Sequence, residues 1–182
     1  MPRNDWLVGG DRRAVAAERI YAAAAELIAR HGIDAFDIDA LAARVHCSRA
    51  TVYRYAGGKA EIRDAVLTRA ANRIIEAVRS DVERLSGPDR VGTAVILALR
   101  RIRADPLGRL MISSIRVTDE MSWLTSSPLL AGFATDIAGL TDGDPQAAQW
   151  LVRVVLSLMY WPPENDEAER QLVQRFVAPA FH

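Results

Sequence analysis

The sequence predicts an all-α protein of about nine helices, in which a three-helix head precedes a larger helical body. Two observations predict this class. Hydrophobic residues make up 50% of the 182 residues, enough for a buried core, and the larger ones recur at helical spacing, whereas no segment alternates apolar and polar residues as a strand does. In addition, a capping residue followed by proline, which marks a helix start, occurs three times in the second half.

Four helices are predicted in the first half of the chain. They span residues 12–30, about 38–45, about 49–55 and about 59–85. Gly32 ends the first, alanine-rich helix, because glycine readily adopts the left-handed conformation that follows a helix. Asp37 is the expected N-cap of the second. Gly57-Gly58 separates the third from the fourth, and Gly87-Pro88 ends the fourth.

The second half carries the repeated start signal. The pairs that predict helices beginning near residues 106, 128 and 145 are Asp105-Pro106, Ser127-Pro128 and Asp144-Pro145. Another helix is predicted from about 90 to 104, before the first pair. Trp161-Pro162-Pro163 ends the helix that begins at 145, and a last helix runs from about Asp166 to Ala178.

The most informative stretch is Phe36–Ile62, FDIDALAARVHCSRATVYRYAGGKAEI. It predicts two short helices joined by a tight turn, with Ile38, Leu41 and Val45 on one face of the first and Val52 on the second. The second helix also carries hydroxyl and guanidinium groups, which suit DNA phosphates and guanine. Helix-turn-helix heads place such a helix in the major groove. The residues predicted to contact DNA are Ser48, Arg49, Ala50, Thr51, Tyr53, Arg54, Tyr55 and Lys59.

This stretch resembles the DNA-binding head of the tetracycline-repressor (TetR) family of bacterial regulators. The matching residues are Ala40-Leu41-Ala42-Ala43-Arg44, Ser48-Arg49, Thr51, Tyr53-Arg54-Tyr55, Gly58 and Lys59, after a long helix that ends at His31-Gly32. The resemblance covers roughly residues 12 to 65. It implies a cytoplasmic homodimeric repressor without a cofactor, which a small apolar or amphipathic effector releases from a palindromic operator in double-stranded DNA. The domains it implies are a flexible arm at 1–10, a DNA-binding domain at 11–58 and a ligand-binding and dimerisation domain at 59–182.

Residues that depart from the family pattern are His46, Cys47, Asp37 and Ala56, and Cys47 takes the place of a small apolar residue. His46 stands at a glycine position where left-handed backbone is often needed, a conformation that histidine adopts more readily than most residues. Asp37 replaces a common threonine, and its charge opposes a phosphate. Ala56 replaces a phenylalanine and leaves space in the core of the head. The aromatic residues predicted to fill that space are Trp6, Tyr21 or Phe36.

Other functional classes find little support in the sequence. No catalytic serine, histidine and aspartate arrangement or phosphate-binding glycine loop occurs, so no catalytic residue is assigned. The histidines, His31, His46 and His182, lack metal-ligand spacing. Cys47 stands at a normally apolar position, where it mimics a small hydrophobe rather than a redox sensor. A net charge of zero argues against non-specific coating of nucleic acid, and no apolar run approaches the ~20 residues of a membrane span.

Several alternatives remain open at this stage. The regulator is equally compatible with activation or with dependence on a corepressor. A helical binding or scaffold protein with a vestigial helix-turn-helix is the alternative from another class. The basic run Arg100-Arg101-Ile102-Arg103 is either a second nucleic-acid patch or, as we expect, a helix face paired with acids on a neighbouring element.

The resemblance implies an effector pocket among the middle helices of the body. Methionine and tryptophan suit an adaptable apolar site, although each such residue is also an ordinary core residue. Arg116 is the candidate polar anchor. The predicted ligand-binding residues are Met111, Arg116, Met121, Trp123, Phe133, Trp150 and Met159.

The segment 145–161 predicts a dimer interface. Its polar stripe is narrow, consisting of Gln146, Gln149, Arg153 and Ser157. A helix that is apolar around most of its surface is buried on more than one side, and the last helix, with Leu172, Val173, Phe176 and Val177 predicted on one face, supplies the second element of a four-helix interface. The alternative is that both helices only fill the core of one subunit. The predicted interface residues are Leu151, Val155, Leu158, Leu172 and Phe176.

Overall fold

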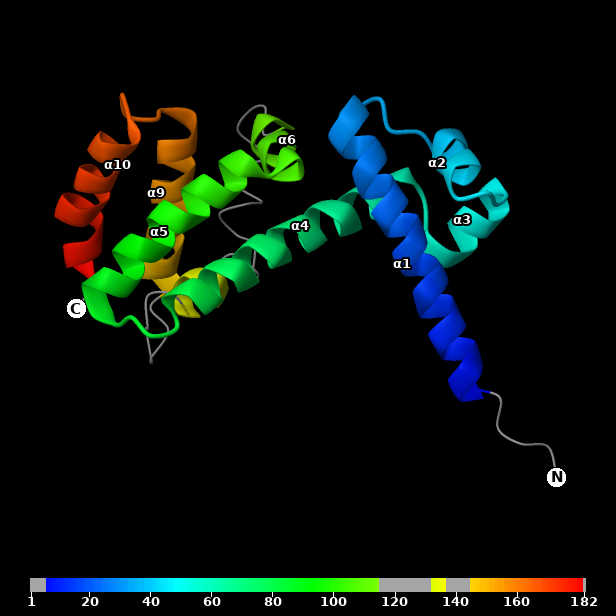
Figure 1. The fold of residues 1–182 in the computed structure, drawn as a ribbon, viewed down its shortest axis with the longest axis horizontal. Coiled ribbons are helices and arrows are strands. Elements are labelled where there is room, and N and C mark those ends of the chain that lie inside the picture. The colour runs from blue at the N-terminus through cyan, green and yellow to red at the C-terminus, as the bar shows by residue number, and fades with distance from the viewer. Residues whose placement is uncertain (1–5, 115–131, 137–144, 182) are drawn as a thin grey trace. The chain divides into compact units, whose positions relative to one another are not determined.

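The computed structural model describes residues 6–114, 132–136 and 145–181, and within these ranges every regular element is a helix (Figure 1). The all-α prediction is confirmed. The chain divides into two compact units, Met1–Ala70 and Ala71–His182. Within the described ranges, no helix has the length and apolarity needed to cross a bilayer.

The first unit consists of three helices and the beginning of a fourth. These are α1 (Trp6–His31), α2 (Ile38–Arg44), α3 (Arg49–Ala56) and the first turns of α4 (Lys59–Val82). Helix α1 packs against both α2 and α3. Its start at Trp6 makes residues 6–10 of the predicted arm helical, since the Gly9-Gly10 pair lowers helix propensity without forbidding the helix. The predicted end is confirmed at Gly32, whose φ is 86°.

Apolar positions at helical spacing build the core of this unit. The largest buried side chains are Ile28, Phe36, Leu41, Val52 and Ile62, each at most 2% exposed. The predicted cap of α2 is also present, because Oδ2 of Asp37 accepts a hydrogen bond from the backbone N–H of Ala40 at 3.3 Å. The two short helices of the predicted motif therefore pack against α1 and against each other.

The second unit contains the remaining helices. They are the rest of α4, α5 (Gly87–Ala104), α6 (Pro106–Ser114), α9 (Pro145–Tyr160) and α10 (Asp166–Leu172), which continues as a π-helical turn (Val173–Val177) and a 3-10 helix (Ala178–Ala180). The starts predicted at 106 and 145 are confirmed, and the start predicted at 128 lies outside the described residues. Asp105 caps α6, because its Oδ1 accepts hydrogen bonds from the backbone N–H groups of Leu107 at 2.8 Å and Gly108 at 3.1 Å.

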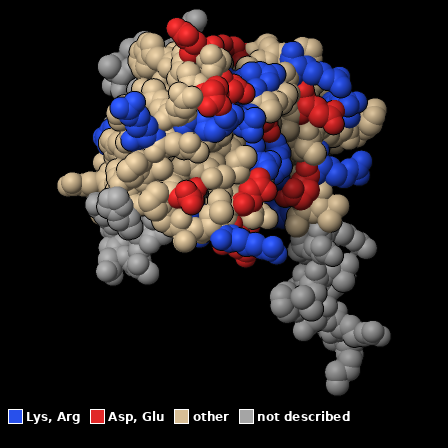
Figure 2. Space-filling model, turned by 60° about the vertical axis from the view of Figure 1, so that its left-hand side comes forward, with Lys and Arg blue, Asp and Glu red and all other residues tan. Residues whose placement is uncertain are grey.

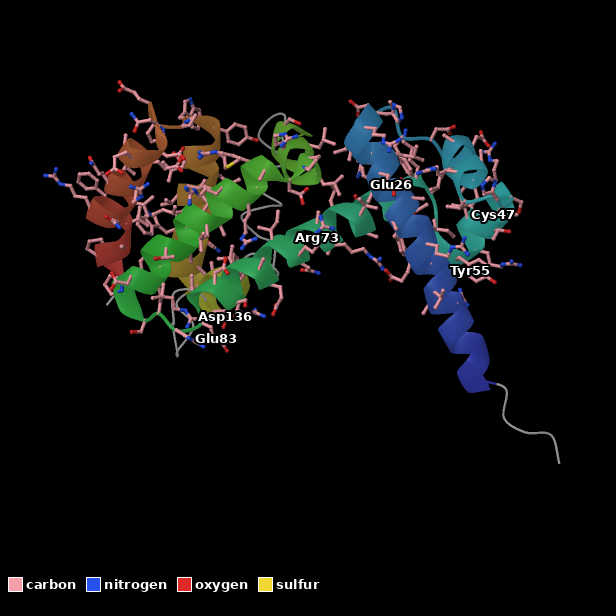
Figure 3. All side chains as sticks on the ribbon, viewed as in Figure 1. Glu26, Cys47, Tyr55, Arg73, Glu83 and Asp136 are labelled. Carbon is pink, nitrogen blue, oxygen red and sulfur yellow. The ribbon has the colours of Figure 1, made fainter. Side chains whose placement is uncertain are left out.

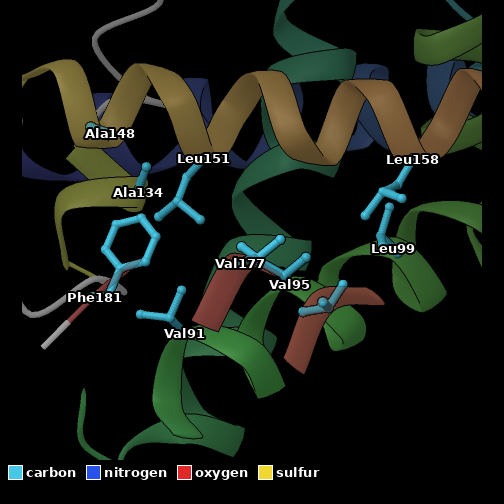
Figure 4. Packing of buried hydrophobic residues seen from close by; sticks show 10 residues of the cluster. Val91, Val95, Leu99, Ala134, Ala148, Leu151, Leu158, Val177 and Phe181 are labelled. Atoms are coloured by element: carbon cyan, nitrogen blue, oxygen red, sulfur yellow. The ribbon is translucent and has the colours of Figure 1, made fainter. Parts of the chain in front are cut away.

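Helix α5 lies at the centre of this unit and packs against α9 and the turns that follow α10. Figure 4 shows the resulting apolar cluster. Its buried members are Val91, Val95, Leu99, Ala134, Ala148, Leu151, Leu158, Val173, Val177 and Phe181. Burying one such aliphatic side chain contributes about 1.5–3 kcal/mol. A second cluster, formed by Ile74, Val78, Val82, Ala94 and Ala98, packs the end of α4 against α5.

A partly buried ion pair joins α5 to α10 in the second unit. The guanidinium of Arg103 on α5 donates two hydrogen bonds to the carboxylate of Glu169 on α10, at 2.9 and 2.7 Å. It also donates to the carbonyl oxygen of Leu158 on α9 at 3.1 Å. Arg101 pairs with Asp81 on α4. Two arginines of the predicted basic run are thus paired with acids on neighbouring helices, as expected.

Candidate nucleic-acid interface

The turn between α2 and α3 closes α2 with two backbone hydrogen bonds. The N–H of Cys47 donates to the carbonyl of Ala42 at 3.0 Å, and the N–H of His46 donates to that of Ala43 at 3.2 Å. This is a Schellman motif, which requires a left-handed residue directly after the C-cap. His46 occupies that position with φ 55°, as predicted from its place in the sequence. The turn therefore fixes where α3 begins.

Ser48 starts α3 as its N-cap. Its Oγ accepts a hydrogen bond from the backbone N–H of Thr51 at 3.2 Å and lies 3.0 Å from the Oγ1 of Thr51. Val52 and Ala56 point into the core, at 0% and 6% exposure, so the opposite face of α3 is the one presented to solvent. Cys47, between the two helices (Figure 3), is half-buried and not disulfide-bonded.

The outward face of α3 carries the polar residues that the sequence predicts for DNA contact. Arg49, Ala50 and Arg54 are exposed, and the side chain of Tyr53 is 49% exposed. Tyr55, labelled in Figure 3, is half-buried, with the guanidinium of Arg54 at 4.8 Å from its ring centre. Hydrophobic anchoring on one side and exposed donors on the other are what a helix in a groove requires.

Arg49 is flanked by a hydroxyl and a carboxylate. Its Nε lies 3.2 Å from Oδ1 of Asp39 on α2. The hydrogen bond with Tyr53, followed by the negative charge of Asp39, raises the pKa of Arg49.

Lys59 is the first residue of α4, where the sequence predicts a phosphate contact. Before it, the N–H of Gly58 donates to Oε2 of Glu61 at 3.0 Å, half of a capping box. Gly57 ends α3 with φ 86°. The ammonium group of Lys59 donates to the carbonyl oxygen of Asp34 at 3.1 Å, and the residue is exposed at the start of α4.

Tyr21, one of the residues predicted to fill the space left by Ala56, reaches the backbone of that residue. The hydroxyl of Tyr21 donates to the carbonyl of Ala56 at 3.4 Å. Arg69 of α4 lies 4.2 Å from the centre of the Tyr21 ring and donates two hydrogen bonds to Glu18 of α1, at 2.6 and 2.7 Å. These bonds lower the pKa of Glu18. No local pattern in the sequence predicts this cluster, because Glu18 and Arg69 are 51 residues apart.

Charge is distributed without a dominant sign on the face drawn in Figure 2, where basic and acidic side chains are interspersed. This agrees with the formal net charge of zero. Within the described residues, no group of three or more histidine, cysteine, aspartate or glutamate side chains is placed to hold a metal ion.

The predicted effector residues that the structure describes do not meet in one pocket. Phe133 lines a cleft of about 750 Å³, whereas Trp150 lines a separate groove of about 620 Å³ and its ring lies 5.6 Å from that of Phe181. Met159 packs against the apolar cluster around α5. Arg116, Met121 and Trp123 lie outside the described residues, as does the side chain of Met111 on α6.

The cleft at Phe133 also contains polar residues that the sequence did not single out. Arg79 on α4 contacts Asp136 at 2.6 Å and Glu76 at 3.0 Å, and Asp136 is labelled in Figure 3. The i, i+3 spacing of Glu76 and Arg79 predicts their ion pair from the sequence. No pattern in the sequence predicts their contact with residues 132–136. The described lining is Asn72, Ile75, Glu76, Arg79, Gly132, Phe133 and Asp136.

The predicted interface residues differ in exposure: those of α9 face the core of their own unit, and those near the C-terminus are exposed. Leu151 and Leu158 are 4% and 6% exposed in the core of their own unit, and Val155 is half-buried against the same cluster, so the first two are not available to a partner. Leu172 and Phe176 are 38% and 65% exposed.

The predicted single face of the last helix is also corrected. Val173 and Val177 are 0% and 3% exposed, whereas Leu172 and Phe176 point to solvent. Successive residues differ by about 100° around a helix, so the four form an inward and an outward stripe. Trp161, 75% exposed, is not among the predicted interface residues, since the sequence marks it only as part of a helix stop.

Comparison with known proteins assigns a family model to the head. Residues 20–66 match the model described as bacterial regulatory proteins, tetR family. Two Mycobacterium tuberculosis proteins, from strains CDC 1551 / Oshkosh and ATCC 25618 / H37Rv, are each 28% identical to this chain over 98% of its length and 91% of theirs. Both are described as uncharacterised HTH-type transcriptional regulators.

Solved structures share the fold. The TetR family repressor AlkX from Dietzia sp., implicated in the biodegradation of n-alkanes, superposes with a TM-score of 0.61 at 18% identity, covering 90% of this chain and 93% of AlkX. The fatty acid degradation regulator FadR from Bacillus halodurans superposes with a TM-score of 0.56 at 17% identity, covering 88% of this chain and 98% of FadR.

Proposed function

The chain belongs to the tetR family of bacterial regulatory proteins, and from this premise we propose that it is a transcriptional repressor whose helix α3 enters the major groove of a palindromic operator. One observation carries the proposal. Helix α3 is anchored by Val52 and Ala56 and presents Arg49, Tyr53 and Arg54 to solvent. Members of this family are regulators rather than enzymes, and a repressor of this kind acts in the cytoplasm, where the chromosome lies.

The polar residues of the head divide into two roles. Arg49 is placed at the N-terminal end of α3, the part of a recognition helix that meets base edges. Tyr53 and Tyr55 offer hydroxyls, and Lys59 offers a cation, to the phosphates on either side. Phosphate contacts fix the position of the head on the duplex, and base contacts supply its sequence preference.

Members of the family bind operators as dimers, and we propose that this chain dimerises through the outward stripe formed by Leu172 of α10 and Phe176 of the π-helical turn that follows it, together with exposed apolar residues of α9 and its C-terminal end. Exposed large apolar side chains support this assignment, since water-exposed apolar surface is typical of an interface. They are Trp150, Trp161, Leu172 and Phe176. A two-fold axis through such a surface gives two heads for two half-sites, roughly 34–36 Å apart.

The cleft at Phe133 is our candidate for the effector. Ile75 and Phe133 supply apolar surface, whereas Asn72, Glu76 and Arg79 supply polar groups, a combination that suits an amphipathic molecule. Binding there and binding of operator are linked reciprocally, whichever sign the response has. Fatty acids and n-alkanes are reasonable first probes, because the two structural neighbours are named for the degradation of these compounds.

A DNA-binding assay tests the function directly. Purified full-length chain is titrated against a fluorescent duplex of its own promoter region over a series of salt concentrations. Tyr53→Ala with Lys59→Ala removes two proposed phosphate contacts per subunit and is expected to weaken binding and to reduce the salt slope by about 0.9 for each phosphate that is no longer neutralised. Arg84→Ala, which removes an exposed arginine of the second unit, is the matched control.

The outcomes separate the alternatives. Wild-type binding that is unaffected by the double variant contradicts the proposed contacts. Absence of any sequence preference favours a helical binding protein with an unused head. Binding that appears only after addition of a small molecule favours a corepressor-dependent regulator.

A further inference from the structure

The first residue of α3 is paired with a carboxylate from the preceding helix. Nε of Arg49 lies 3.2 Å from Oδ1 of Asp39, and the two side chains are 60% and 59% exposed. Ion pairs this exposed contribute little to the stability of a fold. The pair therefore matters for the DNA groups that Arg49 can bind rather than for the stability of the head.

The pairing orients the guanidinium without using it up. Arginine carries five N–H donors in a rigid planar fork. Asp39 lies nearest to the Nε edge, with its Oδ1 3.2 Å from Nε. Terminal N–H donors still remain. Guanine presents a matching pair of acceptors, O6 and N7, to the major groove.

The local charge disfavours a phosphate as the partner of Arg49. The negative charges of both Asp39 and Asp37, at the beginning of α2, act on its guanidinium. The carboxylate of Asp39, 3.2 Å from Nε, already balances the single positive charge of Arg49, so a phosphate that approaches Arg49 also meets a carboxylate. The acceptor edge of guanine carries no formal charge and is repelled far less.

We propose that Asp39 is a specificity-determining residue, which positions Arg49 to donate to a guanine of the operator and keeps the phosphate backbone away from it. The inference rests on the proposed DNA-binding function. Asp39 acts through Arg49 and is a positioning residue. Its loss should change which DNA the protein prefers more than it changes the fold.

The test begins with wild-type full-length chain and a library of randomised duplexes, from which an operator sequence is selected. Each guanine of that sequence is then replaced in turn by 7-deazaguanine, which lacks the N7 acceptor. Replacement of one symmetry-related guanine in each half-site is expected to weaken wild-type binding about fivefold or more. The same replacement should leave the DNA affinity of the Arg49→Ala variant unchanged.

Asp39→Ala is then measured on the same duplexes. The 7-deazaguanine penalty is expected to shrink, and affinity for a scrambled duplex is expected to rise several-fold. The salt slope on the scrambled duplex should steepen by about 0.9 per subunit, because a released Arg49 then neutralises a phosphate. Asp39→Asn, which keeps the size of the side chain, is the second variant and should change these quantities in the same direction.

Glu26→Ala is the matched control. Glu26 of α1 pairs with Arg44 of α2 at 2.6 Å, and both side chains are about half exposed, so the variant removes the same charge and an equally exposed ion pair from the same head. It should leave the 7-deazaguanine penalty unchanged. The inference would be overturned if Asp39→Ala and Glu26→Ala raised the affinity for the scrambled duplex equally and both kept the full 7-deazaguanine penalty. Asp39 would then act only through the net charge of the head.

The remaining outcomes separate this inference from the function beneath it. If the wild type selects an operator but no guanine depends on Arg49, only the role of Asp39 and Arg49 is overturned. If the wild type selects no sequence at all, both the proposed function and this inference fail.

Discussion

Breaking the ion pair between Arg103 and Glu169 should destabilise the second unit more than breaking any exposed ion pair does. Glu169 is 4% exposed and is held by two hydrogen bonds from Arg103. Arg103→Met keeps most of the side-chain volume but leaves that carboxylate buried without its partner. Removing one member of a buried pair costs about 3–5 kcal/mol, and the side chain of Arg103 is 32% exposed, which favours the lower end, about 3 kcal/mol.

The assay is equilibrium unfolding in urea, followed by circular dichroism. The midpoint of Arg103→Met should fall, whereas the double variant Arg103→Met with Glu169→Met should recover most of the stability, since a buried pair replaced by apolar residues is often neutral. Arg170→Met is the control on the same helix, because Arg170 pairs with Glu167 at the surface and such pairs contribute about 0–1 kcal/mol. Equal destabilisation by Arg103→Met and Arg170→Met, or no recovery in the double variant, would refute the reasoning.

Three further predictions concern the turn, a cap and the dimer. His46→Gly should raise the free energy of unfolding by about 0.5–1 kcal/mol in urea melts, because the left-handed backbone at φ 55° strains histidine; a decrease in stability would show that the His46 side chain has a stabilising contact. Asp105→Ala should cost about 1 kcal/mol near neutral pH. Burial raises the pKa of Asp105, but hydrogen bonds from Arg73 and from two backbone N–H groups outweigh it, and the net pKa is lowered. A lowered folded-state pKa stabilises above the unfolded value of about 3.9, so the difference between wild type and variant should shrink as pH falls below about 4, and a difference that grows there would contradict this account. Phe176→Glu should shift the sedimentation of the protein from dimer to monomer and weaken operator binding, because the residue is 65% exposed on the outward stripe; Gln174→Glu, at an exposed residue that does not belong to that stripe, is the control, and an unchanged dimer would remove the outward stripe from the interface.

Local signals predicted the head well. The caps at Asp37 and Ser48, the left-handed His46 and the glycine breaks each depend on residues within one or two turns of one another. Short-range chemistry of this kind is visible in a sequence, which is why the helix bounds and caps of the head were predictable.

Tertiary contacts account for most of what the sequence left open. Periodicity predicted that α9 is apolar on more than one side, but it does not tell which side its own subunit covers, and Leu151 and Leu158 proved to be internal. The pair Arg103 and Glu169 joins positions 66 residues apart. Likewise, the cleft at Phe133 depends on α4 meeting residues 132–136, and the sequence places neither segment next to the other.

Methylation protection of operator DNA tests the central claim most directly. Dimethyl sulfate modifies N7 of guanine, which is exposed only in the major groove. If α3 of each subunit lies in that groove, the wild-type chain should protect guanines in two symmetric half-sites about 10 bp apart, and Arg49→Ala should lose that protection. Protein that binds the duplex but leaves every guanine N7 as reactive as in free DNA would contradict the account.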